Sequence, residues 1–252
     1  MSELLKTATI KPLALSEADL AKINSYTLEP LKAEEVFAFN LMAGDNGKDD
    51  RNHEPFTTKA LEDMAALYKG RPVIWDHGRG ASGTRQTARV FDAYTKQTDV
   101  DRDGEKETQL ILRAYMLNSE ANQALIADIK AGIIKEVSTG CYPSSVKCSI
   151  CGADQMKGYC RHWPGRSYNG EKCLMSIEGV KDVLEVSFVG KPAQVRAGVT
   201  KSYNPNLHDA CEEDFKEEVR EEAVKTIDEM EVAIKERELY LMIASAEGDT
   251  NE

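Results

Sequence analysis

The sequence lacks any hydrophobic run of the length that crosses a membrane, and it contains no internal repeat or low-complexity tract. A membrane-spanning helix needs about 18 consecutive apolar residues, so no membrane partner is expected. The first ten residues, MSELLKTATI, also lack the apolar core of a secretory signal. We therefore expect the chain to stay in a reducing cytosol, where clustered cysteines bind metal rather than form disulfides.

Basic residues are fewer than acidic ones, and the difference lies in one segment of the chain. The formal net charge of the 252 residues is -11. The segment from His208 to Glu252 holds sixteen acidic and five basic residues, which accounts for that whole excess, so the remaining 207 residues are neutral. A neutral body with an acidic end indicates no nucleic-acid partner, and it leaves the partner of the body open.

The hydrophobic pattern predicts an α+β fold. Alternating or apolar segments predict at least six strands, and two helical segments begin near Thr57 and Ser119. The strands and helices do not alternate as in parallel βαβ units, so we expect a barrel-like, mostly antiparallel sheet with outer helices. We place the folded domain at 1–200, with an insert at 146–173, and a linker at 201–211.

The last segment, 212–252, is predicted to be one acidic amphipathic helix. Its apolar residues recur at helical spacing, and glutamates crowd the opposite side. Such a helix can pair with itself or a partner, and it can equally dock on the body of its own chain. The apolar residues are Phe215, Val219, Ala223, Ile227, Met230, Ile234 and Leu241.

The insert contains the residues with the most distinctive spacing. Cys148 and Cys151 form one close pair, and Cys160 and His162 form a second pair eight residues later. Structural zinc takes four sulfur or nitrogen ligands with short spacers inside each pair. We therefore predict a structural zinc site. Cys173 is expected to be a buried thiol, or a substitute ligand.

Histidine is scarce, with four in the chain. His77 follows an apolar strand and precedes a glycine, so its ring can project from a rigid sheet edge. Ser138 has a similar place at the end of another strand, and Glu185 interrupts the apolar segment VLEVSFV. From the residues alone, a Ser/His/Glu catalytic set and three unrelated structural side chains both remain open, and the structural interpretation is the commoner one because any chain offers such residues.

Three ordered blocks resemble the signature of tailed-phage prohead proteases, the capsid maturation proteases distantly related to herpesvirus assemblin. They are GRPVIWDH ending at His77, EVSTG around Ser138, and LEVSFVGKPA around Glu185. The segment DRNHEPF, before the helix that begins near Thr57, also resembles the family. The resemblance spans roughly residues 35–197, and the cysteine-rich insert departs from the basic family pattern.

The resemblance implies a serine endopeptidase that acts inside the phage procapsid, in the host cytoplasm. It would cleave scaffold or capsid-protein extensions, and its own chain, with Ser138 as nucleophile, His77 as base and Glu185 as the third member. The partners implied are the major capsid protein and the scaffold; the apolar stripe of the C-terminal helix, apart from the resemblance, leaves self-association open.

Two alternatives stay open. The first is a catalytically inactive, zinc-containing scaffolding or assembly protein that kept the protease fold. The second is a zinc hydrolase, which would need an open coordination position that three cysteines and a histidine do not leave.

Overall fold

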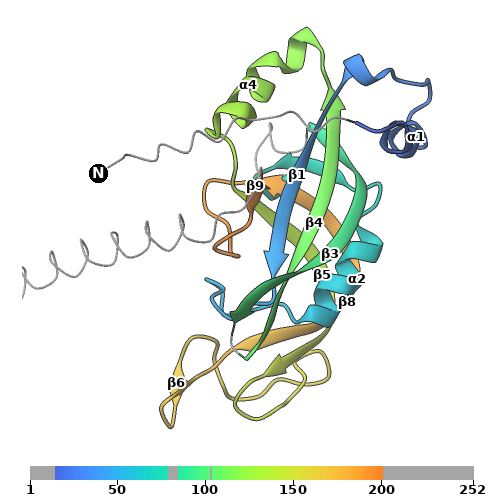
Figure 1. Ribbon diagram of the computed structural model, residues 1–252. Helices are drawn as coiled ribbons and strands as arrows, with labels where there is room; N and C mark the ends of the chain where they lie inside the picture. Colours follow the sequence, from blue (N-terminus) through green and yellow to red (C-terminus); the bar gives the residue numbers. More distant parts are fainter. Residues whose placement is uncertain (1–14, 79–84, 103, 201–252) are drawn as a thin grey trace, which may run out of the picture. The chain divides into compact units, whose positions relative to one another are not determined.

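The computed structural model describes residues 15–78, 85–102 and 104–200. A seven-stranded sheet forms the framework, with the strand order β5-β8-β2-β3-β4-β1-β9 (Figure 1). Its strands are β1 (Val36–Asp45), β2 (Pro72–Trp75), β3 (Ala88–Arg102), β4 (Glu105–Leu117), β5 (Val137–Cys148), β8 (Met175–Phe188) and β9 (Gly198–Thr200). The helices are α1 (Glu17–Asn24), α2 (Thr58–Leu67) and α4 (Gln123–Ala131), with short 3-10 turns η1 (Ala33–Glu35), η2 (Asp76–Gly78) and η3 (Glu120–Asn122).

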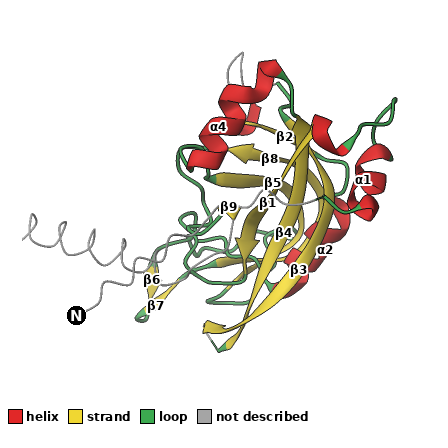
Figure 2. Ribbon diagram, turned by 45° about the horizontal axis from the view of Figure 1, so that its top comes forward, coloured by secondary structure: helices red, strands yellow, loops and turns green. Residues whose placement is uncertain are grey.

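The sheet curls until its two edges meet at one end. Every strand pair is antiparallel except β2 with β8. Just before β5, Glu136 bridges Gly198 of β9, and the N–H of Val137 donates to the carbonyl of Ala197. The prediction of an α+β fold with a curled, mostly antiparallel sheet is therefore confirmed, and Figure 2 shows the helices outside it.

The helix predicted near Thr57 begins there, whereas the one predicted near Ser119 begins as the 3-10 turn η3 and continues as α4 from Gln123. Ser16 caps α1 in a reciprocal capping box with Asp19, and the Thr57 hydroxyl accepts a hydrogen bond from the N–H of Ala60 at the start of α2. The inner side of α2 buries Leu61 and Met64 completely. This burial holds α2 against the sheet, with its closest packing on β8.

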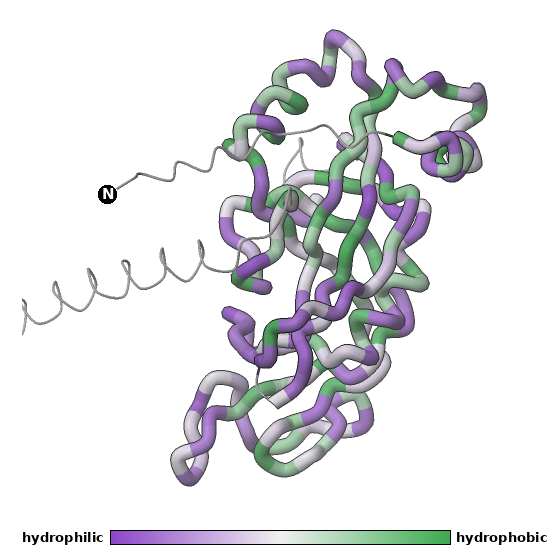
Figure 3. Tube along the Cα trace, in the orientation of Figure 1, coloured by the Kyte–Doolittle hydropathy of each residue, from purple (hydrophilic) through white to green (hydrophobic). Residues whose placement is uncertain are grey.

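One continuous apolar core lies between the sheet and α2. Figure 3 shows many of the hydrophobic stretches in the strands of the sheet. The largest completely buried side chains of this core include Tyr68, Leu41, Leu110 and Phe188. Sheet and helix together therefore give a rigid support for the residues that project from β2, β5 and β8.

The predicted end of one strand is wrong. Ser138 is predicted to end its strand, whereas it lies near the start of β5, which continues past Gly140 to Cys148 along β8. Four register shifts between Gly140 and Val146 accommodate the glycine and Pro143, because β5 is an edge strand and a bulge tolerates residues that break a regular ladder. Likewise β8 begins at Met175, earlier than the apolar run beginning at Val183 predicts.

The insert connects β5 to β8 and contains a small hairpin of β6 (Ser167–Tyr168) and β7 (Glu171–Lys172). In both ribbon views it lies beyond one end of the sheet, and α4 lies beyond the other (Figures 1 and 2). The predicted linker 201–211 and helix 212–252 lie outside the described residues. In the described part of the chain, no helix is long and apolar enough to cross a membrane.

Candidate functional site

His77 occupies an unusual backbone conformation at the end of β2. Three successive residues, Asp76, His77 and Gly78, have φ angles of 42°, 54° and 75°. Left-handed backbone is uncommon outside glycine and costs roughly 1–3 kcal/mol per residue. Such a conformation persists only where surrounding contacts hold it, and it concentrates at functional sites.

The contacts that hold His77 come from β8. Its Nδ1 lies 2.9 Å from Oε1 of Glu185, which is 8% exposed. Ser187 is completely buried and joins the two residues: its hydroxyl donates to Oε2 of Glu185 at 2.5 Å and accepts the backbone N–H of His77 at 3.0 Å. With the Nδ1 proton directed to the carboxylate, Nε2 is left as the basic nitrogen.

Ser138 lies on the strand beside this pair. The register of β5 and β8 pairs Ser138 with Ser187 and Gly140 with Glu185. Directly paired residues of an antiparallel ladder share a face, with Cβ atoms about 5 Å apart. A Cβ on Gly140 would lie 2.5 Å from Oε1 of Glu185, so glycine is required for the carboxylate to lie across the strand.

The structure thus joins His77 to Glu185 and places Ser138 on the same sheet face as that carboxylate. Among the described residues, no hydrogen bond connects the Ser138 hydroxyl to the imidazole. Two of the three predicted residues, His77 and Glu185, are therefore in direct contact, and Ser138 lies on the neighbouring strand.

A backbone donor lies next to Ser138. Val137 directs its N–H away from β8, to Ala197, whereas the Glu136 carbonyl accepts from Val189 on the β8 side. Because antiparallel pairing alternates along a strand, Thr139 directs its N–H away from β8 as well. No described residue accepts this hydrogen bond, so the N–H faces the open edge beside Ser138.

Ser187 and Tyr68 were missed from the sequence. The Tyr68 hydroxyl donates to the backbone carbonyl of Glu185 at 3.0 Å, which ties α2 to the strand segment carrying the carboxylate. Burial, helped by the nearby Cys141 and Glu185, raises the pKa of Tyr68, so it stays a donor. The position of Ser187 two residues after Glu185, on the same strand face, was the one available signal.

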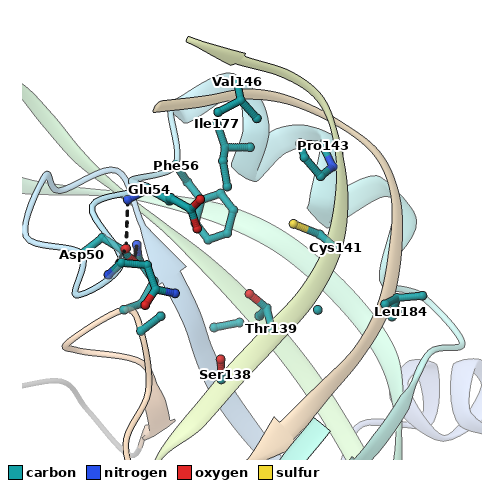
Figure 4. A pocket seen from close by; sticks show the side chains of 15 residues that line it. Asp50, Glu54, Phe56, Ser138, Thr139, Cys141, Pro143, Val146, Ile177 and Leu184 are labelled. Carbon is teal, nitrogen blue, oxygen red and sulfur yellow. Dashed lines mark hydrogen bonds between the residues drawn. The ribbon is translucent and has the colours of Figure 1, made fainter. Parts of the chain in front are cut away.

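Ser138 also lines a pocket of about 410 Å³, which neither His77 nor Glu185 lines. In Figure 4, Ser138 and Thr139 lie on one wall, the Cys141 sulfur points inward, and Asp50 and Glu54 stand on the opposite side. Burial raises the pKa of Cys141 to about 11, which keeps this thiol protonated and poorly nucleophilic.

The insert brings together the four residues predicted to bind metal. Donor atoms of Cys148, Cys151, Cys160 and His162 all lie within 4.8 Å of one another. Nδ1 of His162 is buried without a hydrogen-bond partner, which is what a ring nitrogen reserved for a metal requires. The chemistry and arrangement of these donors fit a tetrahedral metal ion.

The protein backbone supports the same interpretation. Burial raises the pKa of Cys148, but hydrogen bonds from the N–H groups of Cys151 and Ile150 outweigh it, and the pKa is lowered. The ring of His162 packs edge-on against Tyr168, with 4.6 Å between centroids. Thus the β6–β7 hairpin orients one ligand, and the end of β5 supplies another.

Cys173 is completely buried, as predicted, with its sulfur 3.8 Å from that of Cys148. It packs with Cys148 and Met175 in a small apolar cluster at the base of the insert. This thiol is therefore a neighbour of the metal-binding group rather than an isolated core residue.

Comparison of the chain with family models, with curated proteins and with solved structures finds no match.

Proposed function

We propose that the chain is a serine endopeptidase of the tailed-phage prohead type, acting inside the procapsid in the host cytoplasm. It cleaves scaffold and capsid-protein extensions, and its own chain, during capsid maturation. Three sequence blocks that resemble this family support the proposal, and they surround the residues His77, Ser138 and Glu185.

One observation carries most of the weight. Nδ1 of His77 contacts Glu185, and His77 lies in a left-handed turn whose backbone N–H donates to the Ser187 hydroxyl. A structural histidine has no need of a strained backbone and a nearly buried carboxylate partner. A general base needs both a fixed tautomer and a fixed ring orientation, and this arrangement supplies them.

The chemistry assigns a role to each group. Oγ of Ser138 attacks the carbonyl carbon of the scissile bond, and its proton passes to Nε2 of His77. Glu185 offsets the charge on the imidazolium, while the N–H of Thr139 donates to the developing oxyanion. His77 then protonates the departing amine, and water hydrolyses the acyl-enzyme by the same route in reverse.

We assign the insert a structural zinc, held by Cys148, Cys151, Cys160 and His162. Four protein ligands leave no open position, so the metal would stabilise the insert. No step of the peptide hydrolysis passes through it.

The alternative is a catalytically inactive assembly protein with the same fold. What favours it is that no hydrogen bond joins Ser138 to His77 in the described residues. Catalytic hydrogen bonds often tighten only when substrate binds, so this observation does not decide against the protease.

Co-expression with the capsid and scaffold proteins of its phage tests the proposal. Mass spectrometry should find new N-termini in those partners with the wild-type chain and with Ser144→Ala, an exposed serine on the same strand. Ser138→Ala should produce none of them. If the capsid and scaffold proteins have no new N-termini in any of the three samples, the result would favour the inactive assembly protein.

A further inference from the structure

The pocket beside Ser138 is separate from the His77–Glu185 pair, because neither residue lines it. It lies along the open edge of β5, where a substrate presenting its carbonyl to Ser138 would also place a neighbouring side chain. The pocket is therefore placed to bind a substrate side chain and so to select the substrate, and it takes no part in the chemistry.

One part of the pocket wall is apolar. Phe56 is buried beneath it, and Ile177, Val146 and Pro143 close the end farther from Ser138. These side chains suit an aliphatic stem and would exclude water from it.

The charge of the pocket has one sign. Among the described residues no lysine, arginine or histidine lines it, whereas Asp50 and Glu54 both do. Asp50 is already satisfied: its carboxylate accepts from the N–H groups of Asn52 and Glu54 and from the amide of Gln194.

Glu54 is different, because no described residue makes a hydrogen bond or ion pair with its carboxylate. Although solvent reaches it at the rim, partial burial and the nearby charge of Asp50 raise the pKa of Glu54. The raised pKa means that the folded protein disfavours the negative charge of Glu54. A cation bound beside the carboxylate would stabilise that charge.

We propose that this pocket selects a lysine or arginine side chain of the substrate, with Glu54 as the specificity-determining residue. The apolar walls take the aliphatic stem, and the Glu54 carboxylate takes the ammonium or guanidinium group. The proposal rests on the proposed function, since it assumes that Ser138 is where a peptide binds.

Binding of two matched peptides to the Ser138→Ala protein tests this without any turnover. The peptides are acetyl-Ala-Ala-Lys-Ala-Ala-amide and the same sequence with norleucine, which keeps the stem and removes the charge. Dissociation constants come from NMR shift titration. We expect the lysine peptide to bind about tenfold more tightly, as a charge-assisted contact predicts.

Glu54→Gln should remove this preference, whereas Glu62→Gln, an exposed acid on α2 outside the pocket, should leave it intact. Equal affinities for the two peptides, binding of neither, or a preference that survives Glu54→Gln would each overturn the proposal. Failure of the protease function is distinguishable, because the wild-type chain would then bind lysine selectively yet produce no new N-termini.

Discussion

Nδ1 of His77 lies 2.9 Å from Oε1 of Glu185, although the two residues are 108 positions apart in the sequence. The parallel pairing of β2 with β8 produces this contact, since it sets Trp75 beside Phe188 and brings the turn after β2 over the carboxylate. This is the one parallel pairing among the described strands of the sheet, and it builds the candidate site.

This relationship predicts a graded loss of activity. His77→Ala removes the base, whereas Glu185→Gln keeps the ring in place but weakens control of its tautomer. We expect the loss of kcat/KM for Glu185→Gln to be roughly two orders of magnitude smaller than that for His77→Ala. Kinetics on a peptide containing a mapped cleavage site measure both, and equal losses would argue against an orienting role for Glu185.

The insert should contain one metal ion. Metal analysis of purified protein is expected to give about one zinc per chain. Cys151→Ser should abolish zinc retention and loosen the insert while the main sheet stays folded, because the ligands are local. Cys141→Ser, outside the cluster, is the matched control, and a Cys151→Ser protein that still holds one zinc would contradict this ligand set.

Acid should loosen the contact between α1 and the sheet. Hydrogen bonds from Arg113 lower the pKa of Asp19 to about 2. A depressed pKa contributes stability above the unfolded value and loses it as the pH falls through the folded value, here between about 4 and 2. With solvent screening this contributes about 1 kcal/mol.

Arg113→Met should remove that part of the acid sensitivity. Urea unfolding of wild type and variant at pH 6 and pH 2.5 measures the difference in the free energy of unfolding. The gap between the two proteins should be smaller at pH 2.5 than at pH 6, and a gap that stays constant would show that Asp19 does not titrate in this range.

The sequence beyond Lys201 should be separable from the folded domain. It contains the whole net negative charge and its own apolar stripe. A chain ending at Lys201 should keep its circular dichroism spectrum and melting temperature, while losing self-association or scaffold binding in sedimentation experiments. Unfolding on truncation would indicate that the stripe packs on the body of the chain.

Most of the framework was predictable from local patterns. The cap at Thr57, the apolar strands and the paired spacing around Cys148 and Cys160 all act over a few residues. Such signals can be recognised in a sequence because the residues that interact are close neighbours in the chain.

What could not be predicted depends on pairing between distant strands. The role of Ser187 follows from its place between Glu185 and the turn at His77, which only the sheet order reveals. The continuation of β5 past Gly140 depends on bulges, and the acidic pocket depends on a loop before α2 meeting β5. No local pattern encodes these contacts.

Covalent labelling identifies the nucleophile most directly. The wild-type chain and Ser144→Ala, treated with a fluorophosphonate probe, should each gain one adduct, which tandem mass spectrometry should locate on Ser138. His77→Ala should slow that labelling by at least about a hundredfold, the usual scale of a positioned general base. An adduct on any other residue, or labelling of Ser138 at the same rate without His77, would contradict the account.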